Sequence, residues 1–400
     1  MKTRMIVLRA MGVQSTRRPF DGVLGGPRFE ATEITAGLRV EIEENANRGV
    51  LRTLSNDSTV VSMAPPMPIK LIEPFEGNAG LTPKQTGATW GVTAVGATNS
   101  PFDGTGVSVA VLDTGIDPTH AAFNGVQLKE RDFTGGGNGD QNGHGTHCAG
   151  TIFGRALNGL RIGVAPGVTR ALIGKVLGGP SGGGSDVLSE AMLWAYQEGA
   201  NVISMSLGID FPGYVERLVQ EQGLRIRQAT SIALDAYGAN VRLFERLAGY
   251  LSAGASFSQA FLITAASGNE SGRDEKPPFE VNVAPPAAAP GIVSVAALGQ
   301  GVQGFVVAPF SNARAIVAAP GVDVVSARAG GGTRTLSGTS MTTPHVAGVA
   351  ALWVQKLKAQ GSLNPVVLLA RVIGSGTFAG VAAGTDPLDV GSGLVQAPLN

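Results

Sequence analysis

The sequence lacks a second cysteine, a long apolar run and an excess of either charge. Cys148 is the only cysteine, so no intramolecular disulfide can form and a zinc site of several cysteines is excluded. No apolar run reaches the roughly 18 residues that span a bilayer. Thirty basic and thirty acidic residues balance each other, which argues against nucleic acid or an anionic membrane as the main partner.

The first residues also lack a recognisable signal peptide. Arg9 interrupts the apolar stretch from Met5 to Leu8, which is too short for a signal-peptide core and is better predicted as a strand. What the sequence has instead is glycine, at 58 of 400 residues, with only 15% charged residues. This composition is typical of a tightly turned α/β domain with many short loops.

A serine at the start of a predicted helix is the first candidate for chemistry. Ser340 lies among small residues just before the apolar run 346–354, so a substrate can approach its hydroxyl closely. Serine is also a favoured N-cap, and alone Ser340 is better explained as a cap.

Two distant residues change that interpretation. Asp113 ends a predicted buried strand, at the sheet edge where ligands bind in open parallel sheets. His144 lies between two glycines at the start of another predicted helix. Together with Ser340 they supply a nucleophile, a base to take its proton, and a carboxylate to orient the base.

Five motifs in chain order resemble those of a subtilisin-like serine protease, a subtilase, across about residues 101–395. The order Asp, His, Ser is that of subtilisin. The Cys that follows the second histidine resembles the proteinase K branch of the family. The motifs are Asp-Thr-Gly-Ile-Asp (113–117), His-Gly-Thr-His-Cys-Ala-Gly (144–150), Ser-Met-Ser-Leu-Gly (204–208), Ala-Ser-Gly-Asn-Glu (266–270) and Gly-Thr-Ser-Met (338–341).

The resemblance implies a three-layer α/β fold with a mainly parallel central sheet, and hydrolysis of peptide bonds through an acyl-enzyme. His144 takes the proton of Ser340, Asp113 orients His144, and Asn269 with the Ser340 amide stabilises the oxyanion. The resemblance also implies substrate-binding segments with no charge, so medium-sized apolar residues such as Leu, Met or Phe are expected before the scissile bond. These segments contain Gly182, Gly183, Gly184, Ser206, Leu207, Gly208 and Ala284.

The chain before the motifs has a different composition. Residues 1–75 are predicted to form a small α+β domain, residues 76–100 a linker with the start of the mature region, and residues 101–400 the catalytic domain. By resemblance the first domain is a propeptide, which the enzyme cuts off between Pro65 and Gly87 and which then inhibits it. A permanently attached accessory domain is the alternative.

An insertion is predicted within the catalytic domain. The stretch 210–240 lengthens a connection that the family usually makes with one helix, here expected at 241–252.

The resemblance also bears on partners and ions. Protein or peptide substrates and the chain's own propeptide are the expected partners, and a monomer is expected. No cofactor is required for the chemistry. Structural calcium stays open, but the site found in relatives is expected to be weak or absent, because Ala122 stands where they have a carboxylate ligand. Asp117, Asp132 and Asp140 are either ligands of other ion sites or solvated.

The sequence also allows other interpretations. The resemblance implies secretion, but without a recognisable signal peptide an intracellular location or a non-standard export route is also compatible with the sequence. Functional alternatives are a binding module that has lost catalysis, and an esterase or transpeptidase, since other nucleophiles can intercept an acyl-enzyme. The absence of Gly-x-Ser-x-Gly around Ser340 argues against an α/β-hydrolase.

Overall fold

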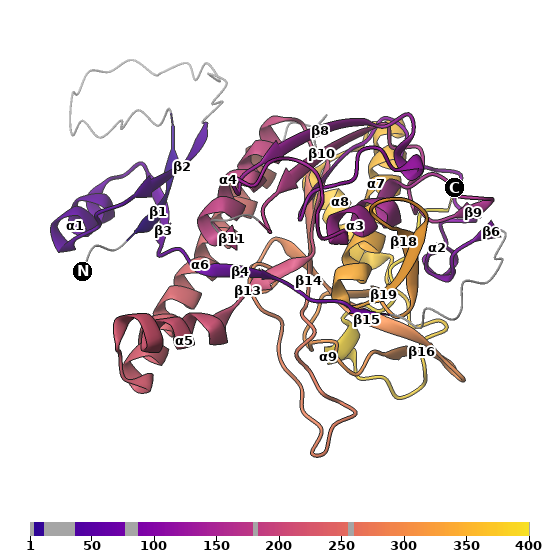
Figure 1. Cartoon of the computed structure of the whole chain (residues 1–400). Coiled ribbons are helices and arrows are strands. Elements are labelled where there is room, and N and C mark those ends of the chain that lie inside the picture. The colour runs from indigo at the N-terminus through magenta and orange to yellow at the C-terminus, as the bar shows by residue number, and fades with distance from the viewer. Residues whose placement is uncertain (1–3, 12–36, 77–86, 179–182, 255–259, 400) are drawn as a thin grey trace, which may run out of the picture.

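The computed structural model describes residues 4–11, 37–76, 87–178, 183–254 and 260–399 (Figure 1). In these ranges the chain forms a small N-terminal domain, an extended segment that leaves it, and a large α/β domain. Gly182 and residues 77–86 of the predicted linker lie outside the described residues.

The large domain is built on an eight-stranded sheet that is parallel except for β16. Strand β7 runs through its middle, and all six of its residues are buried, as expected for a parallel strand covered on both faces. The predicted α/β fold with a mainly parallel sheet is confirmed. The strand order is β16 (Gly304–Val307), β15 (Ile292–Gly301), β14 (Leu262–Ala266), β12 (Val202–Met205), β7 (Ser108–Asp113), β10 (Arg170–Lys175) and β8 (Gln127–Asp132), with β17 (Val317–Pro320) also paired to β15.

Helices cover both faces of this sheet and form two apolar cores. One core lies against α2 (Trp90–Ala94), α3 (His144–Phe153), α7 (Thr339–Ala359) and α8 (Pro365–Gly374). The other lies against α4 (Ser185–Gln197) and α6 (Ile226–Gly254). The two helices that begin at the predicted catalytic residues, α3 and α7, thus share one side of the sheet.

The N-terminal domain is an antiparallel sheet of order β2-β1-β3 with one helix. Its strands are β1 (Met5–Ala10), β2 (Leu38–Glu43) and β3 (Val60–Ala64). Asn47 caps helix α1 (Arg48–Asn56) by accepting hydrogen bonds from the amides of Gly49 and Val50. Apolar residues of the sheet, such as Ile6 and Leu8, belong to the same core as α4 and α6, so this domain packs on those two helices.

The chain between the two domains is extended and pairs with strands of the large domain. Strand β4 (Pro68–Leu71) lies between β11 (Gly183–Gly184) and β13 (Leu207–Ile209) and pairs antiparallel with both. Strand β5 (Phe75–Glu76) then pairs with β19 (Thr333–Ser337), whose other neighbour is β18 (Val324–Ala327). We call residues 68–76 the cleft segment.

The helix predicted at 241–252 is present, but it begins well before residue 241. Helix α5 (Phe211–Gln222) is followed by α6, a single helix of 29 residues that runs through Gly238. Its first half packs on α5 through Ala229 and Ala233, and its second half packs on the main core through Phe244 and its neighbours. This packing on both halves outweighs the roughly 1 kcal/mol that a glycine costs inside a helix.

No helix in these ranges is both long and apolar enough to cross a membrane.

Short elements complete the described chain. The short elements are β6 (Gly87–Ala88), η1 (Ala121–Phe123), β9 (Leu160–Arg161) and α9 (Pro387–Val390).

Candidate active site

Asp113 and His144 meet where β7 ends and α3 begins. The Nδ1 of His144 donates to Asp113 Oδ1 across 2.7 Å, and both side chains are 1% exposed. Asp113 also accepts a hydrogen bond from the amide of Thr114 at 2.8 Å. The carboxylate therefore fixes both the orientation of the ring and the nitrogen that carries its proton.

A glycine allows the two elements to come this close. A Cβ on Gly145 would lie 2.2 Å from the carbonyl oxygen of Gly115 and 3.2 Å from Asp113 Cβ. Gly143, just before His144, has φ 88°, in the left-handed region that glycine adopts readily. The glycines around His144 thus serve its placement against the end of β7.

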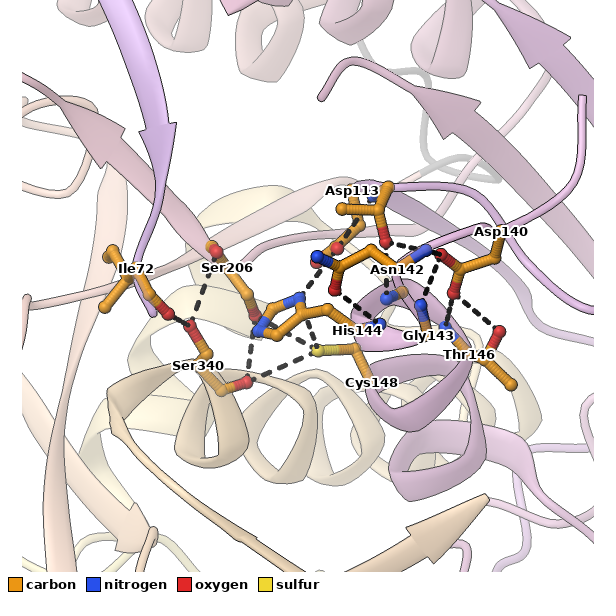
Figure 2. Close-up of polar contacts among 12 residues, drawn as sticks. Ile72, Asp113, Asp140, Asn142, Gly143, His144, Thr146, Cys148, Ser206 and Ser340 are labelled. Atoms are coloured by element: carbon orange, nitrogen blue, oxygen red, sulfur yellow. Dashed lines mark hydrogen bonds and ion pairs between the residues drawn. The ribbon is translucent and has the colours of Figure 1, made fainter. Parts of the chain in front are cut away.

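Ser340 lies at the start of α7 and is fully buried. Its Oγ donates to the carbonyl oxygen of Ile72 at 3.0 Å, with a longer contact of 3.4 Å to that of Ser206. Figure 2 shows the imidazole of His144 between Asp113 and Ser340. The Nε2 of His144 is buried and has no hydrogen-bond partner in the described part of the chain.

His144, His147 and His345 are all buried, but their pKa values are shifted in different directions. Burial lowers the pKa of His144, but the charge and hydrogen bond of Asp113 outweigh this and hold it well above 6.5. Burial, with the charge of His144, lowers the pKa of His147 to about 3, and burial lowers that of His345 to about 4. Asp113 thus favours a charged imidazole at His144 alone among these three histidines.

Cys148 lies one helical turn after His144 and is wholly buried. Its Sγ lies 3.8 Å from His144 Nδ1 and 3.5 Å from the carbonyl oxygen of Ser340. Burial raises the pKa of the thiol, which therefore stays protonated and fills space behind the histidine.

Asn269 stands beside the start of α7, after β14. Its Oδ1 accepts hydrogen bonds from both the amide and the hydroxyl of Thr339 at 2.9 Å, which fixes the direction of the amide group. Its Nδ2 donates at 2.9 Å to the carbonyl oxygen of Glu73. The predicted oxyanion donor therefore binds the carbonyl next to the one that Ser340 contacts.

The predicted substrate-binding residues flank the cleft segment. Gly183 pairs with Ile69, Gly208 with Lys70, and Leu207 with Leu71. Gly184 pairs with Pro68 on the β11 side, and Ser206 donates its hydroxyl to the carbonyl oxygen of Ser340 at 2.9 Å.

Ile72, whose carbonyl oxygen Ser340 contacts, is only 3% exposed. A Cβ on Gly208 would touch the Ile72 side chain at 3.6 Å, so glycine leaves the room that this side chain fills. The loop that begins at Ala284 is joined to β13, because the carbonyl oxygen of Pro285 accepts a hydrogen bond from the amide of Ile209 at 2.8 Å.

Comparisons with known proteins agree on one family. A family model described as the subtilase family matches residues 104–375. The chain belongs to the subtilase family of serine endopeptidases.

Individual relatives are moderately similar. The alkaline serine exoprotease A of Vibrio alginolyticus is 32% identical over 304 residues, which cover 72% of this chain and 47% of that protein. The subtilisin-like serine protease Pen ch 13 of Penicillium rubens is 31% identical over 315 residues, covering 74% and 67%. The crystal structure of a cold adapted subtilisin-like serine proteinase matches with a TM-score of 0.55 and 26% identity, over 78% of this chain and 99% of that one.

Sequence reasoning missed the part that Asp140 plays in this subtilase. The sequence predicts an ion ligand or a solvated acid at Asp140, but its carboxylate accepts a hydrogen bond from Thr146 Oγ1 at 2.7 Å (Figure 2). It also accepts one from Thr114 Oγ1 at 2.9 Å. It also accepts from the amide of Gly143 at 2.7 Å. Asp140 therefore ties the residue after Asp113 to the residues around His144. The short spacing from Asp140 to His144 was the available signal.

The residues considered for calcium have partners within the protein. Both oxygens of Asp117 accept hydrogen bonds, from Thr119 and from the amide of Gly330, and Asp132 likewise binds Thr134 and Gly137. Within the described ranges, Asp113, His144 and Cys148 form the only group of three His, Cys, Asp or Glu side chains close enough to share one ion. The expectation of a weak or absent calcium site stays a prediction.

Proposed function

We propose that this subtilase is made as a self-inhibited precursor whose first substrate is its own Ile72–Glu73 bond. One observation carries the proposal: the Ser340 hydroxyl lies 3.0 Å from the carbonyl oxygen of Ile72. The segment on both sides of that carbonyl is paired as a strand, by β4 before it and by β5 after it. This is how an extended peptide substrate is held by main-chain hydrogen bonds.

The chemistry follows from the geometry of the three residues. The Nε2 of His144 takes the Ser340 proton while Oγ attacks the carbonyl carbon of Ile72. His144 then gives the proton to the amide nitrogen of Glu73, which leaves as a new N-terminus. Water, deprotonated by His144, hydrolyses the Ile72 ester and restores Ser340. Asp113 stays ionised throughout and stabilises the charged imidazole.

The oxyanion has two donors near it. The amide of Ser340 is at the N-terminus of α7, where N–H groups have no partner within the helix. Asn269 is the second donor, and its Nδ2 must move from the Glu73 carbonyl to that of Ile72 as the intermediate forms. This shift makes its hydrogen bond stronger in the transition state than in the precursor.

The cut N-terminal part remains an inhibitor because contacts outside the scissile bond hold it. Ser185 Oγ accepts a hydrogen bond from the amide of Met67 at 3.0 Å, and Asn240 donates to the carbonyl oxygen of Pro65 at 2.9 Å. Strand β4 keeps its pairing on both sides. Protein and peptide substrates gain access to the cleft only when this part dissociates or is degraded.

Mass spectrometry of purified wild-type protein and of Ser340→Ala tests the proposal. The wild type should give a fragment that begins at Glu73, at a rate independent of protein concentration, whereas Ser340→Ala should stay full length. Ser362→Ala, an exposed serine after α7, serves as the control and should be processed normally. A wild type that stays full length while hydrolysing peptides, or a fragment that begins elsewhere, would contradict it.

A further inference from the structure

Lys70 of the cleft segment meets two carboxylates. Counted back from the proposed scissile bond, Ile72 is the first residue, Leu71 the second and Lys70 the third. The Nζ of Lys70 lies 3.5 Å from Asp210 Oδ1 and 3.5 Å from Glu270 Oε1. The position of Lys70 is set by the backbone pairing of β4 with β13, in which Lys70 lies opposite Gly208.

The two acids come from separate elements, and each is held in place. Asp210 is the N-cap of α5, and its Oδ1 accepts a hydrogen bond from the amide of Gly213 at 3.3 Å. Glu270 follows Asn269, and its Oε2 accepts a hydrogen bond from Nδ2 of the fully buried Asn312 at 2.8 Å. The other oxygen of Glu270 is the one near Lys70. Because these contacts fix the carboxylates before a substrate arrives, little side-chain entropy is lost on binding a cation.

We propose that Asp210 and Glu270 form a subsite that selects a basic residue at the third position before the scissile bond. This inference rests on the proposed function, since Ile72–Glu73 defines the count. The substrate class is peptides with an apolar residue before the cut and Lys or Arg two residues earlier. Asp210 begins the α5–α6 insertion, so the insertion contributes directly to specificity.

The size of the effect follows from exposure. Lys70 and Glu270 are each 41% exposed and Asp210 is 28% exposed, so solvent screens both ion pairs. Exposed pairs of this kind each change an equilibrium by about 1.4- to 5-fold. For the two pairs together we expect roughly a 2- to 25-fold preference in kcat/KM for lysine over an uncharged residue, decreasing as salt rises.

The test compares three quenched fluorescent peptides that carry the sequence of residues 67–76, with Lys, norleucine or Glu at position 70. Self-processed wild-type enzyme, with active sites titrated by a fluorophosphonate, should prefer Lys over norleucine and norleucine over Glu at low salt. The double variant Asp210→Asn with Glu270→Gln should bring the Lys to norleucine ratio close to 1. Asparagine is still a good N-cap, so α5 should remain intact.

Glu216→Gln is the matched control, because it removes one negative charge from an exposed position on the same helix α5. It should keep the wild-type ratio. The products identify which proposal fails. Cleavage at a bond other than Ile-Glu would overturn the proposed function and the residue count with it. Cleavage after Ile at equal rates for Lys and norleucine, or a preference that the double variant keeps, would overturn the subsite alone.

Discussion

Asp113, His144 and Ser340 are almost wholly buried, whereas Lys70 of the cleft segment is partly exposed and Glu73 is exposed. The buried centre is placed by close backbone packing, in which Gly145 lets α3 approach the end of β7. The cleft segment is placed by main-chain pairing with β11 and β13, which any extended peptide can imitate. The buried centre therefore determines the reaction, and the partly exposed groups along the cleft determine which chain is cut. Substitutions of these exposed groups should change activity less than substitutions in the centre.

Among the substitutions that test this contrast, Asp113→Asn should have the largest effect on activity. The amide cannot stabilise a charged imidazole and favours the wrong tautomer, so kcat should fall about 10⁴-fold, the loss found for the equivalent change in other serine proteases. Stopped assays on a peptide substrate measure it. An unchanged KM would show that the cleft is intact, and a loss below tenfold would contradict the role assigned to Asp113.

The pH profile tests the same pair without changing the fold. His144 must be neutral to accept a proton, and Asp113 raises its pKa well above 6.5. Activity should therefore be low at acid pH and rise with a midpoint above 6.5. In Asp113→Asn the residual activity should rise at a lower pH, because burial then acts on the imidazole without the opposing charge. A midpoint that does not move would assign the titration to another group.

Asn269→Ala should have the next largest effect, with kcat reduced about 100- to 1,000-fold and KM little changed. A reduction of this size is known for the equivalent donor in subtilisin. The precursor offers an independent readout, because self-cleavage of Ile72–Glu73 should slow by a similar factor. A change confined to KM would mean that Asn269 serves only to bind the cleft segment through the Glu73 carbonyl.

Asp140→Asn should have an intermediate effect, because Asp140 acts through other residues. The variant keeps one acceptor oxygen but turns an NH₂ group toward the amide or hydroxyl of Thr146, which loosens the link between β7 and α3. A misplacement of about 1 Å can lower activity about 100-fold, so kcat should fall by up to that factor. A fluorophosphonate should still label Ser340, but more slowly. Loss of thermal stability with full kcat at low temperature would show a purely structural role.

The sequence was most informative where the function requires an unusual backbone conformation or a close approach of two elements. Asp113 at a strand end and His144 between glycines carry local signals, and the structure brings both to Ser340. The long α6 was not predictable, since Gly238 indicates a break while packing on both halves of the helix overrides it. Lys70, Asp210 and Glu270 meet only through the fold, so no local pattern could join them.

The smallest expected effect concerns the binding of the N-terminal domain after the proposed cut. Asn240 is wholly buried in α6, and its Nδ2 donates to the carbonyl oxygen of Pro65. The loss of one buried hydrogen bond costs about 1 kcal/mol net, so Asn240→Ala should weaken inhibition by the fragment 1–72 about fivefold and shorten the delay before peptide hydrolysis begins. Titrated enzyme should keep its kcat/KM, because Asn240 lies outside the catalytic centre. Gln228→Ala, at an exposed position on the same helix, should change neither the delay nor the inhibition. If Asn240→Ala altered kcat/KM as well, α6 would contribute to the centre itself; if it altered neither quantity, the fragment would be held by β4 and its apolar contacts alone.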